Sequence, residues 1–404
     1  MTTCPNMYYS NCLWIVFILH SFVLGIDSND FNIHGTTSQG WEFVRDLFKD
    51  NFVQERDLGA SMAIYYQGQP VVDLWGGWFD QSRTKPYDHN TLQYVFSTSK
   101  GLVAIAVALC VQRGLLDYSA LVKTYWPEYG QNGKENTTVA DILSHRAGLP
   151  LDDYPMERIL NWTAMVHTLE QREPQWPPGT AHGYHPLTYG WLAGELVRRV
   201  DPKNRTFGQW VRDEITNPLQ IEFYIGLPLE QEYRVSPIET VLNNVDTNDA
   251  NEIFESNPFN DHRVQRAEIP AANGIANARS IALLYASLIG DLDHGKRKQL
   301  LSENMLKRAI KSNTPDNEID ITLGVHTKFG MGFLLYDDMI TSLGSNVFGH
   351  SGLGGSVGLA APAKNFSFSY VINRMNIDQQ IKIDSRYKTM LDKIGSKLDD
   401  RRAF

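Results

Sequence analysis

A serine and a lysine separated by two residues form the first group of side chains that could do chemistry in this sequence. The pattern occurs three times in the 404 residues, at Ser82–Lys85, Ser97–Lys100 and Ser385–Lys388. The first copy lies in a turn-rich, charged stretch and the last on the polar face of an expected terminal helix, so both are predicted to be solvated. The middle copy follows the apolar, strand-like run Tyr94–Phe96 and opens a long apolar segment. It is therefore the candidate for a reactive serine.

The spacing of Ser97 and Lys100 suits proton transfer between them. Residues three apart on a helix share one face, so the lysine amine is expected beside the serine hydroxyl. The free N–H groups and the positive potential of a helix N-terminus favour a developing alkoxide. Burial disfavours the ammonium form of a lysine. Lys100 is therefore expected to accept the serine proton or to pass it to a neighbour.

A serine nucleophile also needs a second proton carrier and an oxyanion hole. Two later segments contain the residue types required. Residues 176–190 include Tyr184 between a glycine and a histidine, and residues 348–358 combine a histidine with a series of glycines. Small residues let a strand edge approach a ligand closely and present backbone N–H groups to it. The second segment is therefore predicted to be a substrate-binding edge.

Helices and strands that could position these residues are visible as periodic patterns. Residues 100–111 are apolar nearly all round, which is typical of a helix buried inside a domain. An amphipathic helix is expected over Ile381–Leu398 at the end of the chain. Runs rich in β-formers predict strands near both termini, at Ser61–Gln67, Pro70–Trp75, Phe333–Tyr336, Ser356–Ala361 and Phe366–Asn373.

Strands near both ends, with a helical region between them, predict an α+β fold. The expected architecture is an antiparallel sheet flanked by helices and built from both termini, with an inserted, mostly helical lobe. The α/β lobe is predicted to comprise residues 27–117 and 269–404, and the helical lobe residues 118–268. Together they would form one domain over residues 27–404.

The composition is that of a folded globular protein and narrows the class of partner. Hydrophobic residues make up 42% and charged residues 21% of the chain, and the net charge is −9. Because no basic stripe is present, nucleic acid is not an expected partner. Cys4 and Cys12 lie in or before an apolar leader, so a cleaved chain would keep only Cys110. No metal or cofactor is implied by the sequence, and a small-molecule substrate is expected.

The hydropathy pattern at the N-terminus is typical of a targeting segment. Residues 13–26 are almost wholly apolar, which predicts a signal peptide or an N-terminal anchor over residues 1–26, with cleavage after Gly25 if it is removed. No Lys or Arg precedes this core, as a signal peptide should have, so an uncleaved anchor and an apolar N-terminus without a targeting role stay open as alternatives. Asn-x-Ser/Thr triplets begin at Asn136, Asn161, Asn204 and Asn365. They strengthen the expectation of a secreted or lumenal glycoprotein.

Three motifs in this order resemble those of class C β-lactamases, D-amino-acid peptidases and EstB-like carboxylesterases. They are Ser97–Lys100, Tyr184, and His350-Ser351-Gly352. The resemblance extends over roughly residues 41–391. Other blocks similar to this family are Asp73–Gly77, Leu143–Pro150, Trp176–Gly179, Asn273–Ser280 and Phe329–Phe333.

The resemblance implies a role for each matching residue. Ser97 would be the acyl-accepting nucleophile and Lys100 its activating partner. Tyr184 would act as general base and later as general acid. His350 would occupy the third-motif position, with Ser351 and Gly352 beside it at the substrate. The oxyanion hole would be formed by the backbone N–H groups of Ser97 and Leu353.

Two departures from the pattern of class C enzymes bear on the substrate. Pro186 stands where those enzymes have an asparagine, so an amide-bearing β-lactam loses a partner. His350 stands where penicillin-recognising members have a lysine, and histidine is largely neutral near pH 7. Both departures favour esters, lactones or thioesters over carboxylate-bearing β-lactams and D-peptides. The resemblance therefore predicts a serine hydrolase that works through an acyl-enzyme.

Alternatives on the same fold remain open at this point. The site could serve a β-lactamase, a D-peptidase or an acyltransferase, or the chain could be a catalytically silent scaffold that assembles with copies of itself. Lys328-Phe329-Gly330 is a rival third motif, which we set aside because no Gly-Gly strand follows it. His145 and Arg279 are expected to make structural bonds.

Overall fold

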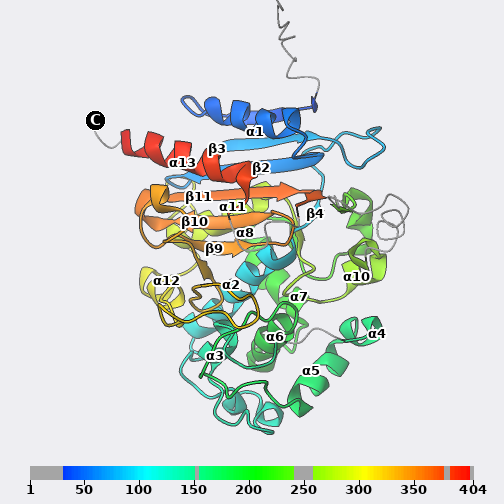
Figure 1. Cartoon of the computed structure of the whole chain (residues 1–404), viewed down its shortest axis with the longest axis vertical. Coiled ribbons are helices and arrows are strands. Elements are labelled where there is room, and N and C mark those ends of the chain that lie inside the picture. Colours follow the sequence, from blue (N-terminus) through cyan, green and yellow to red (C-terminus); the bar gives the residue numbers. More distant parts are fainter. Residues whose placement is uncertain (1–30, 151–153, 241–257, 377–382, 401–404) are drawn as a thin grey trace, which may run out of the picture.

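A seven-stranded antiparallel sheet forms the frame of the protein in the computed structural model, which describes residues 31–150, 154–240, 258–376 and 383–400 (Figure 1). The strand order is β1-β3-β2-β11-β10-β9-β8, so strands from the two ends of the chain meet where β2 pairs with β11. The strands are β1 (His34–Thr37), β2 (Gly59–Tyr66), β3 (Gln69–Gly77), β8 (Leu334–Leu335), β9 (Phe348–Ser351), β10 (Val357–Ala361) and β11 (Phe366–Ile372). The predicted sheet built from both termini is confirmed.

Both faces of the sheet are covered, and the strand sequences show why. Along β2, Met62 and Ile64 pack into one hydrophobic cluster, while Ala63 and Tyr65 pack into another. This alternation follows from the two-residue period of a strand. Helices α1 (Phe43–Val53) and α13 (Ser385–Asp400) cover the first face, and α11 (Ala278–Ile289) covers the second.

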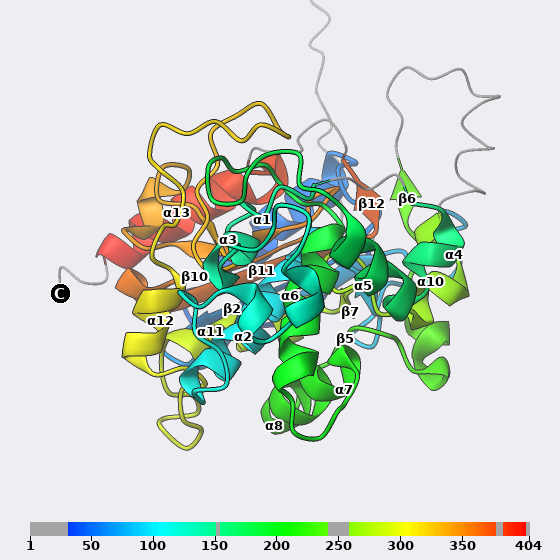
Figure 2. The ribbon, with the colours of Figure 1, turned by 90° about the horizontal axis from the view of Figure 1, so that it is seen from below.

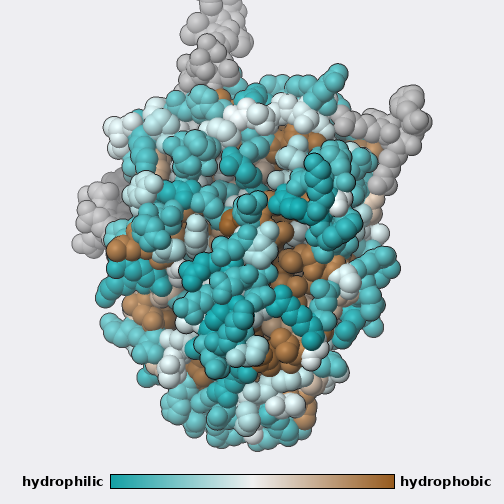
Figure 3. All heavy atoms as spheres, turned by 180° about the vertical axis from the view of Figure 1, so that it is seen from behind, coloured by the Kyte–Doolittle hydropathy of each residue, from teal (hydrophilic) through white to brown (hydrophobic). Residues whose placement is uncertain are grey.

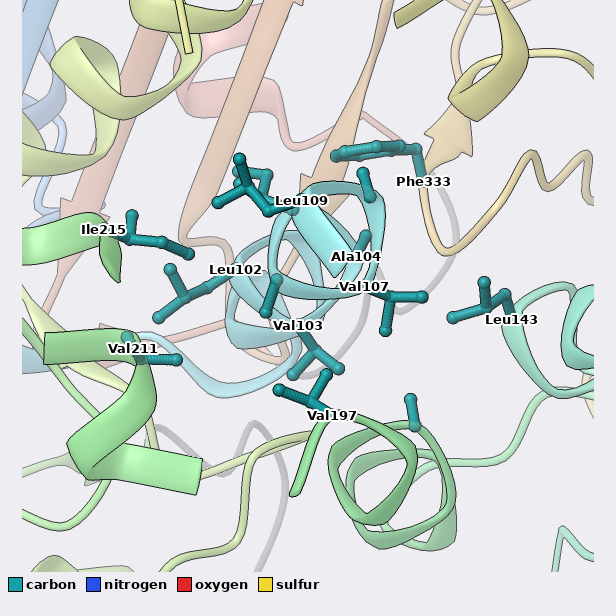
Figure 4. Packing of buried hydrophobic residues seen from close by; sticks show 14 of the residues in the cluster. Leu102, Val103, Ala104, Val107, Leu109, Leu143, Val197, Val211, Ile215 and Phe333 are labelled. Carbon is teal, nitrogen blue, oxygen red and sulfur yellow. The ribbon is translucent and has the colours of Figure 1, made fainter. Parts of the chain in front are cut away.

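Helix α2 (Ser99–Gln112) lies in the middle of the molecule, between the sheet and the helical lobe (Figure 1). Every residue from Ser99 to Val111 is buried. Figure 4 shows Leu102, Val103 and Val107 of this helix among side chains from the surrounding helices. A helix without a polar face needs such an environment, and the predicted buried helix is confirmed. It gives the Ser97–Lys100 pair a rigid support.

The segment between the two halves of the sheet is mostly helical, as expected (Figure 2). It contains α3 (Val139–Leu143), α4 (Met156–Ile159), α5 (Trp162–Gln171), α6 (Thr188–Val200), α7 (Phe207–Val211), α8 (Asn217–Leu219) and α10 (His262–Arg266). Helix α6 packs directly on α2. The residue boundaries of the two lobes stay a prediction.

Short strands join the lobes close to the nucleophile. Strand β7 (Ile275–Ala276) pairs with β4 (Gln93–Tyr94) on one side and with β5 (Phe223–Tyr224) on the other, while β12 (Arg374–Met375) pairs with β6 (Glu239–Thr240) in parallel. Helix α12 (Glu303–Ala309) precedes β8. Strand β1 was not predicted, because its polar sequence on a sheet edge shows no apolar alternation.

The face of the molecule seen from behind is mixed in hydropathy among the described residues. Seen from behind, hydrophilic residues cover most of the surface and hydrophobic ones gather in smaller areas near its middle (Figure 3). Within the described part of the chain, none of the helices combines the length and the apolar character needed to cross a bilayer. The expected leader, residues 1–26, lies outside the described residues.

Candidate active site

Ser97 lies in a 3-10 turn, Phe96–Thr98, which runs directly into α2. The predicted strand over Tyr94–Phe96 is wrong in its second half, because β4 ends at Tyr94 and Phe96 adopts a left-handed backbone with φ of 45°. Such a conformation costs a non-glycine residue on the order of 1 kcal/mol and needs support from its surroundings. The Ser99 hydroxyl supplies it by donating to Phe96 O and accepting from Gly274 N (2.9 Å).

Lys100 is completely buried, and its amine meets three oxygen atoms. Nζ lies 3.0 Å from Ser97 Oγ, 2.7 Å from Pro186 O and 3.0 Å from Ala271 O. An ammonium would donate to all three, whereas a neutral amine would donate to the two carbonyls and accept from the serine hydroxyl. Both protonation states therefore fit the same geometry. A proton can pass between Oγ and Nζ without rearrangement of the other bonds.

Tyr184 flanks this pair and is held through its backbone. Lys100 Nζ lies 4.8 Å from the centroid of the Tyr184 ring. Tyr184 N donates to both carboxylate oxygens of Asp320, at 3.0 and 3.2 Å. Asp320 is fully buried and also accepts from Thr327 Oγ1 at 3.1 Å. Asp320 was missed at the sequence level, because it follows Tyr184 by 136 residues and no motif links the two.

Three buried histidines surround Tyr184 and are neutral. Burial, with the nearby Lys100 amine, lowers the pKa of His350 to about 3. Burial also lowers the pKa of His185 to about 3, and that of His145 well below its usual value. The His145 ring lies 4.8 Å from the Tyr184 ring, and the His350 ring lies 6.2 Å from it. The third-motif histidine is thus uncharged at pH 7, in contrast to a lysine at that position.

Strand β9 brings the third motif to the nucleophile. A Cβ on Gly352 would overlap the carbonyl oxygen of Val95, so a glycine is needed where the strand approaches the nucleophile turn. Thr98 Oγ1 donates to Ser356 O at 3.1 Å and so connects the turn between β9 and β10 to the segment that carries Ser97. Leu353 lies on this turn and is 40% exposed.

A cleft of about 360 Å³ opens above Ser97. The predicted site residues Ser97, Tyr184 and His350 line it, with Lys100 buried beneath them. No Lys, Arg, Asp or Glu occurs among the described residues that line the cleft. Its other walls are mostly apolar and, apart from Pro186 and the third-motif edge, were not foreseen. They are Phe96, Pro186, Leu187, Phe259, Ala272, Leu323, His326, Thr327, Phe329, Leu334, Met339, Ser351, Gly352 and Leu353.

The residues that the sequence analysis set aside are engaged elsewhere. Lys328 of the rival motif pairs with Asp338 at 2.9 Å and is not among the cleft-lining residues. Arg279 pairs with Asp73 at 2.6 Å. His145 Nδ1 accepts a hydrogen bond from His185 N at 3.1 Å, a structural bond as expected, and its ring also packs against Tyr184.

Comparison with known proteins gives the family. The sequence matches the Beta-lactamase family over residues 44–388. The chain belongs to this family. An esterase/beta-lactamase of Mycobacterium tuberculosis, LipL, is 33% identical over 85% of this chain and 83% of its own length. The predicted resemblance is therefore confirmed.

Solved structures agree over nearly the whole chain. A family VIII carboxylesterase superposes with a TM-score of 0.80 and 31% identity, covering 91% of this chain and all of that chain. A penicillin-binding protein homologue from Caulobacter crescentus gives a TM-score of 0.79 and 34% identity over the same shares. The expected fold is confirmed, and the chain is a serine hydrolase of the β-lactamase family.

Proposed function

We propose that this β-lactamase-family hydrolase cleaves neutral carboxylic esters through an acyl-enzyme on Ser97. The observation that carries the proposal is the contact of Ser97 Oγ with a buried Lys100 amine, at the base of an apolar cleft. Nucleophilic serines need such an adjacent proton acceptor.

The proposed reaction has two steps. Ser97 Oγ attacks the ester carbonyl, and its proton passes to Lys100 and Tyr184 while the backbone N–H groups of Ser97 and Leu353 bind the oxyanion. The carbon–oxygen bond to the alcohol then breaks, and the alcohol leaves with that proton. Water next attacks the acyl carbonyl and gives a proton to the same pair. The bond between the acyl carbon and Ser97 Oγ then breaks, and that proton passes to Oγ as the acid leaves.

The charge of the cleft favours a neutral substrate. Arg and Lys are the usual charged partners of a bound carboxylate, and neither occurs among the described residues that line the cleft. His350 is neutral, so it offers a carboxylate no fixed positive charge. The Lys100 amine is already held by the carbonyl of Pro186. Relatives named as an esterase/beta-lactamase and as a family VIII carboxylesterase support an ester as the substrate.

A fluorophosphonate probe tests the nucleophile directly. Intact-mass analysis is expected to show one covalent adduct on the wild-type protein and none on Ser97→Ala, because this variant lacks the serine that Lys100 activates. Ser82→Ala is the matched control, since Ser82 lies in an exposed loop, and it should keep the adduct. Absence of an adduct on the wild type would favour a catalytically silent scaffold.

Turnover of three substrate types then separates the activities open to this site. Short p-nitrophenyl esters are expected to be hydrolysed faster than a D-Ala-D-Ala peptide or a carboxylate-bearing β-lactam. Faster turnover of the β-lactam would assign the chain to the alternative activity. Transfer of the acyl group to an added alcohol would instead indicate an acyltransferase.

We also propose that the chain follows the secretory route and is glycosylated. The apolar segment before residue 27 and the four Asn-x-Ser/Thr triplets support this. Asn136, Asn161 and Asn204 are exposed to solvent, whereas Asn365 is only partly exposed in the turn between β10 and β11.

Expression in a eukaryotic secretory host provides the test. N-terminal sequencing is expected to find a chain that begins at Ile26, and an endoglycosidase should lower its mass. Replacing Asn136, Asn161 and Asn204 together by Gln should abolish that mass loss, while Asn365→Gln alone should preserve it. A chain that keeps its first 25 residues and is unaffected by the glycosidase would contradict the proposal.

A further inference from the structure

The turn between β9 and β10 carries Leu353 and is held from its far side by a buried arginine. The carbonyl oxygen of Gly354 accepts a hydrogen bond from Asn376 N at 3.0 Å and another from Arg386 Nη2. Arg386 lies in the first turn of α13. Helix α13, which otherwise packs against the sheet, thus reaches the turn beside the cleft through Arg386.

The guanidinium of Arg386 is fixed by a set of partners on all sides. Its side chain is only 2% exposed. Nε and Nη2 pair with the two carboxylate oxygens of Asp384, at 3.0 and 2.7 Å, while Nη1 donates to Arg374 O at 2.9 Å and to Asp57 Oδ1 at 3.3 Å. A planar group held on both edges has one orientation. The Gly354 carbonyl therefore meets a donor of fixed position.

The neighbouring glycine shows that the turn is shaped around this arginine. Gly355 has φ of 121°, and a Cβ there would overlap both Arg386 Nη2 and the Asp384 carboxylate. A side chain at this position would push the guanidinium away from the turn. On the cleft side, Thr98 holds Ser356 O. Leu353 thus lies on a turn that is clamped between the nucleophile segment and Arg386.

We propose that Arg386 is a positioning residue for the oxyanion hole: through the Gly354 carbonyl it sets the place of the Leu353 N–H relative to Ser97. This inference rests on the proposed function, because it takes the oxyanion donors from that reaction. Arg386 is distant from the substrate and acts only through the turn. Its loss should weaken stabilisation of the charged intermediate and leave ground-state binding of the ester unchanged.

Arg386→Lys tests the proposal, because lysine keeps the charge and loses the planar set of donors. Removing one oxyanion donor from a serine hydrolase lowers kcat by about 10²–10³-fold, so we expect a fall in kcat on the order of 10²-fold with KM within about twofold of wild type. The inhibition constant of phenylboronic acid, which adds to Ser97 as a tetrahedral anion, should rise in parallel. Asp384→Asn keeps the arginine but loosens its plane, and should lower kcat by about tenfold.

Tyr370→Phe is the matched control, since Tyr370 donates to Asp57 in the same buried cluster at 2.5 Å and does not touch the turn. It should lower Tm without changing kcat or boronate affinity. If Arg386→Lys and Asp384→Asn lower Tm as Tyr370→Phe does, and leave kcat and boronate affinity at the wild-type values, the positioning role is refuted. A wild-type protein that neither hydrolyses esters nor binds the boronate would instead refute the proposed function.

Discussion

Replacing Lys100 by methionine or by arginine is expected to lower kcat for ester hydrolysis by about 10³–10⁴-fold, the upper range for the loss of a general base. Methionine removes the proton acceptor of Ser97 and leaves the Pro186 and Ala271 carbonyls without their donor. Arginine restores a cation and donors, but a guanidinium does not release its proton near neutral pH. Both variants should therefore fail at the same step, the removal of the Ser97 proton.

The two variants together decide what Lys100 does. Activity retained in Lys100→Arg and lost in Lys100→Met would show that a fixed positive charge suffices, contrary to the proton-acceptor role. Lys134→Met is the matched control for fold stability. Lys134 is 1% exposed and, like Lys100, donates to two backbone carbonyls, those of Glu170 and Arg172. It should lose stability to a similar degree while kcat stays at the wild-type value.

The parts of the fold that the sequence predicts are those whose burial leaves a periodic pattern. Helix α2 and most strands of the sheet show the period of their own geometry, and the positions of α2, β2, β3, β8, β10 and β11 were predicted within a few residues. The site motifs were recognisable because chemistry restricts the residue types at each position. The Ser97–Lys100 spacing, for example, follows from one turn of helix.

The features that could not be predicted depend on contacts distant in sequence. Phe96 favours a strand, but its left-handed turn is supported by the Ser99 hydroxyl, which also accepts from Gly274 N, 175 residues further along the chain. Asp320 holds the backbone of Tyr184 through a loop with no helical or strand period. The apolar walls Phe259 and Phe329 belong to separate segments that meet only in the folded chain.

Acidification from pH 7.5 to pH 5.5 is expected to lower the free energy of unfolding by about 4 kcal/mol, because three buried histidines resist protonation in the folded state. The pKa of His185 and of His350 is about 3, and that of His145 is well below its usual value, all through burial. In the unfolded chain each binds a proton near pH 6.5. The stability is therefore fully present above that pH and falls as the pH drops through it, so that each histidine contributes a loss of about 1.4 kcal/mol over the whole interval from pH 7.5 to 5.5.

Urea unfolding at half-unit steps between pH 7.5 and 5.5 measures this loss in a window where few carboxylates titrate. His185→Gln should reduce the loss to about 3 kcal/mol, because one proton is removed from the balance while the amide replaces the bonds of His185 to Gly183 O and Leu149 N. His34→Gln is the control, since His34 lies exposed on β1, and it should leave the slope unchanged. A stability independent of pH over this window would contradict the burial of neutral imidazoles around Tyr184.

With that burial intact, the neutral state of His350 persists to well below pH 5.5. Activity lost in mild acid should then follow the fraction of unfolded protein, and should return on neutralisation to the extent that the chain refolds.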